Sequence, residues 1–521
     1  MPVQAPQRAG RPWIVAVSVM FATFMEVLDT TVVNVSLPHI AGTLSATIDE
    51  STWVLTSYLV ANAIILPLTG WLAMQFGRKR LLMASVSGFT MASFLCGLSP
   101  NLASLVIFRI IQGSTGGALQ PLSQAVMLEA FSPRDRGKAM GFWGLGIVVA
   151  PILGPVLGGW LTDSYSWRWI FYINIPVGIT SLVMTKLFIF DPPYIKRQAG
   201  GIDYWGIGLL ALGIGALQLM LDTGQTRDWF SSHFIETLAI VAIAALAIFI
   251  LYEWRTEHPV VDLKVFLVRT YSTCVFLMMT LGFVLFGSLV LVPLMLQTIM
   301  GYPAVEAGLA MAPRGVGSFI GMPLIGLLIN RVDARKLVAL GLLTGGVTLF
   351  WLANLNLDAG YWDIFWPQFV QGFGFSLLFV PLTTIAMSPI SKERMGNATS
   401  LFNLVRNIGG SMGIATTSTL LFRGVQTHTA LLGANVDQYS PAAQTALAGA
   451  RAGFLASGSD PATATLRAYA AVFGLVQRQA TMLSFVEVFR LLGVVFMVLI
   501  PLVLLMKRPH QGAHPAAPPE A

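Results

Sequence analysis

Long apolar runs alternate with short polar connections along most of the chain. Each run has roughly 20 residues, the length that an α-helix needs to cross the hydrocarbon core of a bilayer. The runs predict about fourteen transmembrane helices. They begin near Trp13, Ser51, Leu81, Ala103, Ala139, Ile170, Tyr204, Phe234, Tyr271, Val305, Leu337, Ile364, Ala398 and Ser484. The pattern therefore predicts an all-α polytopic membrane protein.

Composition supports this class and excludes a soluble globular protein. Of the 521 residues, 55% are hydrophobic and only 11% are charged. The net charge of +7 comes from Lys and Arg in short clusters between the runs, which indicates membrane orientation rather than nucleic-acid binding. These clusters fall on the connections that share a side with the N-terminus, so we expect both termini in the cytoplasm. Cys96 and Cys274 lie within apolar runs and indicate neither a disulfide nor a metal site.

An internal repeat constrains the architecture. Residues 70–80 are echoed by 326–336, and residues 109–113 by 368–372. The run from 204 to 254 has no counterpart, which predicts two inserted helices between two parallel six-helix bundles, with the transport site at the interface of the bundles. The expected first bundle spans residues 1–200, and the pair of linker helices spans 201–256. The second bundle spans 257–508 and includes a long outer segment at 424–481. A disordered cytoplasmic tail is expected at 509–521.

Two carboxyl groups lie inside the first apolar run. Asp29 and Glu26 are three residues apart and so share one helix face. An ionisable group within a membrane span is costly unless it is paired or faces water, so it marks a proton or ion pathway by default. We take Asp29 as the proton carrier and Glu26 as the alternative. The competing interpretation is a carboxyl group that stays protonated or pairs only for packing.

Arg109 is the natural partner of Asp29. If their helices meet the outer surface near Pro38 and Ala103, the two residues lie roughly 13 and 9 Å below it. A fixed guanidinium favours release of the Asp29 proton, and a cationic substrate or a shift of the bundles can reverse this preference, which couples the two events. A static ion pair is the alternative. Gln368 replaces Arg109 in the second half, which places proton chemistry in the first bundle.

Further polar residues within the spans are candidates for the substrate cavity. An individual amide is more often a helix-to-helix hydrogen bond than a ligand contact. Arg314 suits a substrate carboxylate, with a structural ion pair as the alternative. The candidates are Asn34, Gln112, Gln120, Arg314 and Arg406.

Several motifs resemble those of the major facilitator superfamily. They are the basic loop at 70–80, the segment 109–113 and the Gly- and Pro-rich run 146–159. Residues 28–38 and 167–178 narrow the resemblance to the fourteen-helix drug:proton antiporters. It implies proton-driven export of hydrophobic or amphiphilic compounds by alternating access, from a bacterial inner membrane, with Asp29 and Arg109 in proton transfer. No cofactor is implied.

The resemblance also implies gating roles. In the basic loop the candidates are Gly70, Gly77, Arg78 and Lys79, although Met74 stands where the family usually has an Asp. The alternative is that the basic residues only anchor the loop on the cytoplasmic side, and we favour a dual role as anchor and gate. In the Gly- and Pro-rich run, prolines kink the helix and small residues allow close approach of neighbours. On the residues alone an ordinary small-residue interface explains the run equally well, but the run resembles the exporter signature of antiporters, which favours a gating role. The candidates are Pro151, Gly154, Pro155 and Gly158.

Two other functions compete with drug export. One is export of a dedicated physiological substrate, such as a fatty acid or a siderophore. The other is a membrane enzyme that modifies lipids with the carboxylates as acid and base. The chain contains no nucleotide-binding Gly-Lys loop, zinc signature or nucleophile elbow, so we expect no enzyme activity.

The outer segment is long enough to fold. It carries two helix starts, Ser440-Pro441 and Asp460-Pro461, and apolar residues at helical spacing from Leu466 onward. One interpretation is a hairpin that lies on its own bundle. The resemblance to inner-membrane pumps of tripartite efflux systems suggests instead a docking surface for a periplasmic membrane-fusion adaptor, which leads to an outer-membrane channel.

Overall fold

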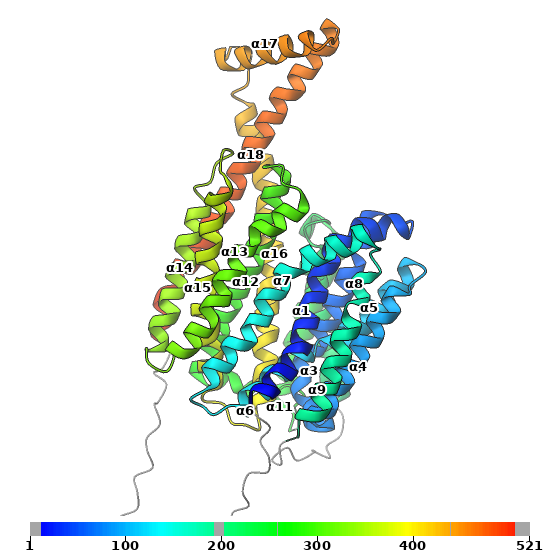
Figure 1. Cartoon of the computed structure of the whole chain (residues 1–521), viewed down its shortest axis with the longest axis vertical. Helices are drawn as coiled ribbons and strands as arrows, with labels where there is room; N and C mark the ends of the chain where they lie inside the picture. Colours follow the sequence, from blue (N-terminus) through cyan, green and yellow to red (C-terminus); the bar gives the residue numbers. More distant parts are fainter. Residues whose placement is uncertain (1–11, 192–202, 258, 438, 506–521) are drawn as a thin grey trace, which may run out of the picture.

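A computed structural model of the chain describes residues 12–191, 203–257, 259–437 and 439–505. Within these ranges all regular secondary structure is helical (Figure 1). The tail expected at 509–521 lies outside the described residues. We call the side of the membrane on which α1 begins the inner side, and the opposite side the outer side.

The first bundle contains six membrane-crossing segments in the expected order. Two of them are interrupted, α5 before α6 and α8 before α9, and a short α2 precedes α3. The helices are α1 (Pro12–Thr43), α2 (Ile48–Ser51), α3 (Trp53–Phe76), α4 (Arg78–Gly97), α5 (Leu102–Gly116), α6 (Leu119–Ala130), α7 (Arg136–Ser164), α8 (Trp169–Tyr172) and α9 (Asn174–Phe188).

The linker pair and the second bundle follow. The linker helices are α10 (Tyr204–Thr223) and α11 (His233–Arg255), with η1 (Trp229–Ser231) between them. The second bundle begins after η2 (Leu263–Leu267) and ends with η3 (Ile500–Leu505). Its long helices are α12 (Arg269–Thr298), α13 (Ala304–Leu328), α14 (Ala334–Leu352), α15 (Tyr361–Met387), α16 (Met395–Gly433) and α18 (Pro461–Leu499), with α17 (Pro441–Ala456) in the outer segment.

Thirteen helical segments of the described chain are long and apolar enough to cross a membrane. The remaining long helix, α16, has 39 residues but falls outside this group because its first half carries polar side chains, including Asn403 and Arg406. It nevertheless packs against α12, α3 and α18 inside the assembly. A helix that faces polar partners in the protein interior does not need the composition of a lipid-facing one.

The outer segment corrects one expected boundary. The last membrane helix does not begin near Ser484, because α18 starts at Pro461 and runs without a break through the membrane. The Asp460 carboxylate caps this start by accepting hydrogen bonds from the backbone N–H of Ala462 and of Thr463, and these bonds lower the pKa of Asp460. Both expected helix starts are present, since α17 begins after Ser440.

The helical hairpin of the outer segment does not lie on its own bundle. Figure 1 shows α17 at the far end of the molecule, held beyond the bundles by the outer parts of α16 and α18. No residue of α17 is buried. The interpretation of a hairpin that rests on the membrane domain is therefore wrong.

One helix, α7, lies between α1 of the first bundle and α13 of the second (Figure 1). Gly158 faces α1, where an added Cβ would come within 2.7 Å of the Val32 backbone oxygen. Gly141 faces α13 and packs against the backbone oxygen of Met322. Small residues on opposite faces thus let α7 approach both bundles closely, and Pro151 and Pro155 lie inside this continuous helix.

Candidate functional site

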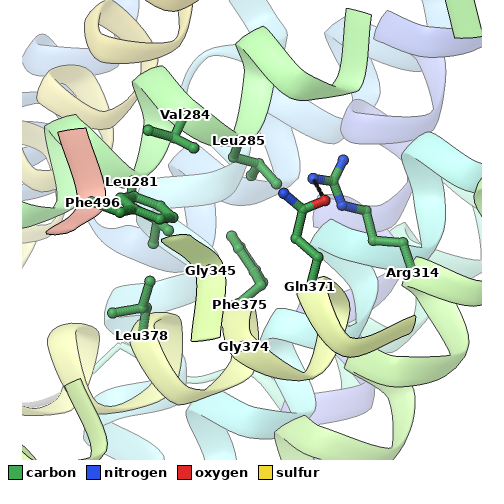
Figure 2. A pocket seen from close by; sticks show the side chains of 10 residues that line it. All are labelled: Leu281, Val284, Leu285, Arg314, Gly345, Gln371, Gly374, Phe375, Leu378 and Phe496. Atoms are coloured by element: carbon green, nitrogen blue, oxygen red, sulfur yellow. Dashed lines mark hydrogen bonds between the residues drawn. The ribbon is translucent and has the colours of Figure 1, made fainter. Parts of the chain in front are cut away.

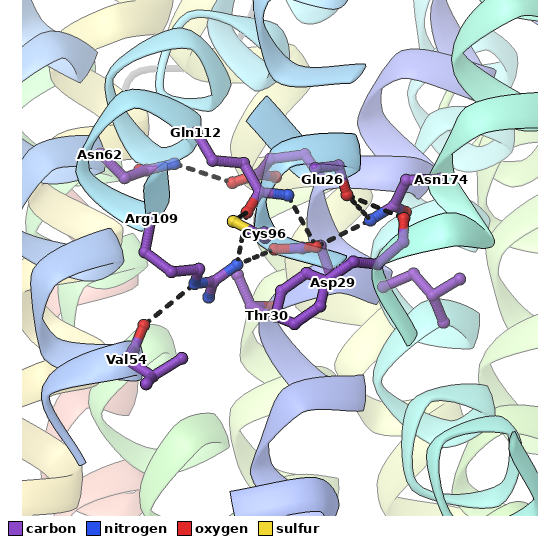
Figure 3. A network of polar contacts seen from close by, with 12 residues as sticks. Glu26, Asp29, Thr30, Val54, Asn62, Cys96, Arg109, Gln112 and Asn174 are labelled. Atoms are coloured by element: carbon purple, nitrogen blue, oxygen red, sulfur yellow. Dashed lines mark hydrogen bonds and ion pairs between the residues drawn. The ribbon is translucent and has the colours of Figure 1, made fainter. Parts of the chain in front are cut away.

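The structure brings Asp29 and Arg109 together in the core of the first bundle (Figure 3). Arg109 Nη1 lies 2.5 Å from Asp29 Oδ2, and both side chains have 0% exposure. The other carboxylate oxygen, Oδ1, accepts hydrogen bonds from Gln112 Nε2 at 2.9 Å and Asn174 Nδ2 at 2.8 Å. Helices α1, α5 and α9 all contribute to this group, so a change in their packing changes the surroundings of the carboxylate.

The guanidinium of Arg109 is held from several sides. Its Nε donates to the backbone oxygen of Val54 at 2.9 Å, and Nη1 also donates to Gln112 Oε1 at 2.9 Å. The guanidinium lies 4.1 Å from the centre of the Tyr58 ring, in a cation–π contact. These contacts fix the cation in place, so motion of α1 rather than of the Arg109 side chain is the simpler way to separate the pair.

Glu26 occupies a second polar group that reaches across to the other bundle. Its Oε1 accepts a hydrogen bond from Asn62 Nδ2 at 3.1 Å, and its Oε2 accepts one from Gln120 Nε2 at 2.5 Å. The carbonyl oxygen of Gln120 accepts a hydrogen bond from Arg406 Nη2 at 2.5 Å. A single amide of α6 therefore connects a carboxyl group of the first bundle with a guanidinium of the second.

Other polar contacts join the bundles nearby. Asn403 Nδ2 of α16 donates to Gln124 Oε1 of α6 at 2.5 Å. Thr399 donates to the backbone oxygen of Pro121 at 3.3 Å. Because all of these contacts link α6 to α16, any rotation of one bundle against the other must break or exchange them.

Arg314 lies apart from these two groups, inside the second bundle. Its Nη2 donates to Ser288 Oγ at 2.7 Å and to Gln371 Oε1 at 2.5 Å. The structural ion pair that we considered for Arg314 is absent among the described residues, since no carboxylate oxygen lies within 4.0 Å of its guanidinium. The helices around it, α12, α13 and α15, all belong to the second bundle.

The remaining cavity candidate, Asn34, is exposed on α1, and no hydrogen bond of its side chain is found among the described residues. The other candidates form parts of the groups above. Gln112 joins the Asp29 group, and Gln120 and Arg406 join the Glu26 group.

The basic loop between α3 and α4 contacts both bundles on the inner side. Arg78 forms an ion pair with Glu129 of α6, and its Nη2 lies 3.5 Å from the backbone oxygen of Lys392. Gly70 packs directly against the backbone of Asn397 at the start of α16. The family usually has an Asp at the position of Met74. In this chain Glu129 of α6 provides a carboxylate for the basic loop.

The turn at Gly77 has a second anchor. Gly77 has a φ of +86°, a conformation that favours glycine. Asp191 accepts a hydrogen bond from the backbone N–H of Lys79 at 2.8 Å, and the Lys79 ammonium donates to the backbone oxygen of Lys186 at 2.7 Å. The loop is therefore tied to the end of α9 within its own bundle.

Sequence reasoning missed several members of these groups. Asn174 lies within a segment quoted for the resemblance, yet its contact with Asp29 depends on how α9 packs against α1. Glu129 is an acidic residue at the inner end of an apolar run, at the depth of Arg78, and this shared depth is the signal that could have found it. Gln371, Asn62 and Ser288 gave no such signal, because isolated polar residues are common in helix contacts.

The chain matches the model of the Major Facilitator Superfamily over residues 19–414. It is 41% identical over 444 residues to the multidrug export protein EmrB of Haemophilus influenzae, covering 84% of this chain and 86% of that protein. It is 42% identical over 435 residues to the fatty acid resistance protein FarB of Neisseria gonorrhoeae, covering 83% and 85%.

The solved structure of the human organic anion transporter MFSD10 (TETRAN) has a similar fold, with a TM-score of 0.57 over 94% of this chain and 100% of that chain. At 13% sequence identity this likeness concerns the fold alone. The thirteen apolar segments and the bacterial relatives indicate an inner-membrane protein that transports rather than catalyses. The match over most of the chain confirms the resemblance seen in the motifs: this chain belongs to the Major Facilitator Superfamily.

Proposed function

We propose that this protein is a proton-coupled antiporter that exports hydrophobic or amphiphilic compounds by alternating access, with both termini in the cytoplasm. The observation that carries the proposal is the buried pair of Asp29 and Arg109 in the first bundle, with no exposed surface on either side chain. A titratable group that is buried in a membrane span next to a fixed cation can exchange a proton only when the surrounding helices move.

The proposed cycle begins with the conformation seen here. The Asp29 carboxylate is deprotonated and held by Arg109, Gln112 and Asn174. A proton that reaches Oδ2 neutralises the carboxylate and weakens its contact with Arg109 Nη1. Since Arg109 is fixed by Val54 and Tyr58, the change releases α1 from α5 and favours a different arrangement of the bundle.

Glu26 links this change to the second bundle. Its contact with Gln120 orients the amide so that the carbonyl oxygen faces Arg406. Protonation of Glu26 leaves a weaker acceptor for the Gln120 NH₂ group, and movement of α1 removes this acceptor, so either change weakens the contact between α6 and α16. In this way a proton in the first bundle biases the equilibrium between the two arrangements of the bundles.

The test uses the purified protein in liposomes with an imposed pH gradient. A cationic dye should move against its gradient, and an uncoupler should stop it. In Asp29→Asn, which keeps the size of the side chain but cannot exchange a proton, driven transport should fall to the uncoupled background while dye binding and dye–dye exchange persist. Full gradient-driven transport by this variant would remove Asp29 from the mechanism.

Glu26→Gln separates the two carboxyl groups. Because the variant preserves a hydrogen-bonding side chain between Asn62 and Gln120, it should alter the pH optimum of transport more than the maximal rate. An unchanged pH profile would exclude Glu26 from coupling.

A second candidate is the export of a dedicated anionic amphiphile such as a fatty acid. The similarity to the fatty acid resistance protein FarB favours it. Direct competition between decanoate and a cationic dye in the same liposomes distinguishes the two: a preference for decanoate of more than about tenfold, equivalent to about 1.4 kcal/mol, would establish the fatty acid as the main substrate. Conversion of a lipid into product without any gradient would instead indicate an enzyme.

The outer hairpin is the proposed docking surface for a periplasmic adaptor. Its support is geometric, since α17 has no buried residue and projects beyond both bundles (Figure 1). Exposed large apolar side chains on the adjoining part of α18 include Leu466, Tyr469 and Phe473. Such a surface on a soluble projection is typical of a protein contact.

Deletion of residues 434–459 tests this role. The variant should lose co-purification with the adaptor but retain proton-coupled dye transport in liposomes, where no adaptor is needed. A substitution on the inner side, Arg331→Gln, serves as the control that keeps adaptor binding. Undiminished binding after the deletion would reject the hairpin as the docking surface.

A further inference from the structure

The linker pair covers the junction at which α3 of the first bundle meets α16 of the second. Helix α10 packs against both of these helices, and α11 packs mainly on α10. The surface of α11 is apolar and exposed, as at Ile243 and Leu251. One cluster of buried apolar side chains fills the contact between α3, α10 and α16, and its members include Ala63, Leu66, Leu210, Ile214, Leu401 and Leu404. The pair therefore stands between this junction and the lipid.

Hydrogen bonds attach the outer end of the linker to α16. Gln218 Nε2 of α10 donates to Ser411 Oγ of α16 at 2.9 Å. After α10 ends, Trp229 Nε1 donates to Thr419 Oγ1 of α16 at 2.8 Å. A hydrogen bond is directional, so it fixes the relative position of the two groups that it joins. These contacts hold the outer end of the linker at one place on α16.

The connection that follows α11 is attached to α16 on the inner side. Asn397 Nδ2 donates to the backbone oxygen of Asp262 at 2.9 Å, and Asn397 Oδ1 accepts from the backbone N–H of Asp262 at 3.2 Å. Val260 and Val261 of the same connection are buried in the apolar cluster. Helix α16 thus holds the linker pair at both sides of the membrane.

The linker contacts α3 through apolar side chains instead. Gly215 of α10 faces α3, where an added Cβ would lie 3.3 Å from Ile64 Cδ1. Among the described residues we find no hydrogen bond or ion pair between α10 and α3. Apolar contacts depend on buried area and not on direction, so they re-form after a shift along the helix surface. Helix α3 can therefore slide past α10, whereas α16 cannot leave the linker without breaking hydrogen bonds.

Helix α16 is in turn part of a closely packed bundle. Its Gly409 packs directly against the backbone oxygen of Met279 in α12. Deeper in the same bundle, Arg314 of α13 donates to Gln371 Oε1 of α15 at 2.5 Å (Figure 2). A linker that is fastened to α16 is thereby fastened to the second bundle.

We propose that the linker pair is a lateral seal over the junction of α3 and α16, which travels with the second bundle and slides on α3. This inference rests on the proposed alternating access, because that motion changes the contact between these two helices. An uncovered junction would open to lipid chains each time the bundles move. The seal keeps the junction closed in every arrangement because its apolar contact with α3 re-forms after each shift.

Nitroxide pairs in the full-length protein in nanodiscs test the motion. The labels are placed at three exposed positions, Ile243 on α11, Phe422 on α16 and Ile107 on α5, and the two native cysteines are buried. Distances are compared at low and at high pH, with and without a cationic dye. The distance from Ile243 to Phe422 should stay constant, whereas that from Ile243 to Ile107 should change by several Å, together with the distance between the bundles.

The three distances separate the possible outcomes. A change in the distance from Ile243 to Phe422 would overturn the proposal, because the linker would then not travel with the second bundle. A constant distance from Ile107 to Phe422 would instead refute alternating access itself, and the sliding seal with it.

Two substitutions release the linker from α16. Gln218→Leu combined with Asn397→Leu should broaden the distribution of distances from Ile243 to Phe422 and make it depend on pH. Asn354→Leu, an exposed asparagine after α14, is the control that should leave this distribution as narrow as in the native protein. An unchanged distribution in the double variant would show that these hydrogen bonds do not fasten the linker.

A phospholipid with a diazirine in its acyl chain tests the seal in the native protein. After illumination in nanodiscs, peptide mapping should find the lipid on α11 but not on Ala63 of α3 or Leu404 of α16. In the double variant, labelling of these two residues should rise several-fold. Lipid adducts on Ala63 or Leu404 of the native protein would overturn the seal, and this measurement stays decisive even if the double variant does not fold.

Discussion

The polar cores of the two bundles are built on the same helix framework but carry different charges. The same interval along the chain separates Gly70 from Gly326 and Tyr58 from Arg314, so Tyr58 and Arg314 occupy equivalent places. Gly113 packs against the backbone oxygen of Tyr58, and Gly372 packs in the same way against that of Arg314.

At these equivalent places the chemistry is rearranged. In the first bundle Tyr58 provides a ring beneath the guanidinium of Arg109. In the second bundle the cation comes from Arg314 itself, and Gln368 stands where Arg109 would be. Gln112 and Gln371 are retained, and each accepts a hydrogen bond from a guanidinium. The repeat thus preserves a cation next to a glutamine but moves it to a different helix.

From this difference we propose different roles for the two bundles. Among the described residues only the first core has a carboxyl group paired with its cation, which is why we propose that this core carries the proton. The second core has a permanent charge and no titratable partner among its described residues. We interpret the first core as the moving, proton-dependent part and the second as a rigid one.

The substitution with the largest expected effect on stability removes the cation of the first core. Arg109→Gln leaves Asp29 buried without its cation, which typically costs about 3–5 kcal/mol. The matched substitution in the second core, Gln368→Leu, should change stability by less than about 1 kcal/mol, since both polar atoms of Gln368 are buried without a partner in the described structure.

Thermal unfolding of both variants in nanodiscs, with the double variant Asp29→Asn/Arg109→Gln as control, checks this expectation. The double variant should recover most of the lost stability. If Gln368→Leu proved as damaging as Arg109→Gln, the two cores would not differ in how strongly their stability depends on a charge pair.

The pairing of Asp29 with Arg109 could be predicted from sequence because it depends on depth alone. A charged residue inside an apolar run is costly unless it has a partner of opposite charge, and the distance of each residue from its helix end fixes its depth in the membrane. Two opposite charges at the same depth are therefore expected to pair. The helix starts were predictable for the same reason, since lipid imposes a length. The start of α18 could not be predicted in this way, because the part of the helix from Pro461 to Leu483 lies beyond the membrane, where the bilayer thickness does not limit helix length.

Contacts between bundles could not be predicted from sequence. The link from Glu26 through Gln120 to Arg406 requires the relative placement of α6 and α16, which no spacing within either helix contains. The contacts of Arg314 with Ser288 and Gln371 depend on how α12, α13 and α15 pack together. Spacing and depth identify which residues are unusual, whereas their partners follow only from the tertiary arrangement.

A smaller effect is expected from a substitution that removes a polar contact between the two bundles. Gln120→Leu removes the amide that connects Glu26 with Arg406, and a hydrogen bond to a charged group contributes about 1.5–3 kcal/mol. The arrangement seen here, in which α6 contacts α16, should therefore lose population by about tenfold or more relative to an arrangement in which these helices separate. Distances between one spin label on each bundle measure this shift.

Gln124→Leu is the matched control for that link. It also removes a contact between α6 and α16, the one with Asn403, but it does not touch Glu26. Both variants should shift the distance distribution, but only Gln120→Leu should change how that distribution depends on pH. An identical pH dependence in the two variants would show that Gln120 is merely another packing contact.

The smallest effect concerns the inner side of the membrane, where the carboxylate of Glu129, which is mostly covered by protein, can be compared with the exposed carboxylate of Asp135. Glu129→Gln removes the carboxylate that pairs with Arg78 and should open the inner side several-fold more often, as an inner-side pair of spin labels would report. Asp135→Asn should leave the same distances unchanged at pH 7, because Asp135 pairs with Lys138 on the exposed surface, where ion pairs contribute little.

Hydrogen bonds from Lys138 and Ser132 lower the pKa of Asp135 below its ordinary value of 3.8. A carboxyl group with a lowered pKa stabilises the folded protein at pH values above its ordinary pKa, and this stabilisation is lost as the pH falls through the folded-state pKa. The melting temperatures of native and Asp135→Asn protein should therefore differ less at pH 3 than at pH 7. A larger difference at pH 3 would contradict this assignment.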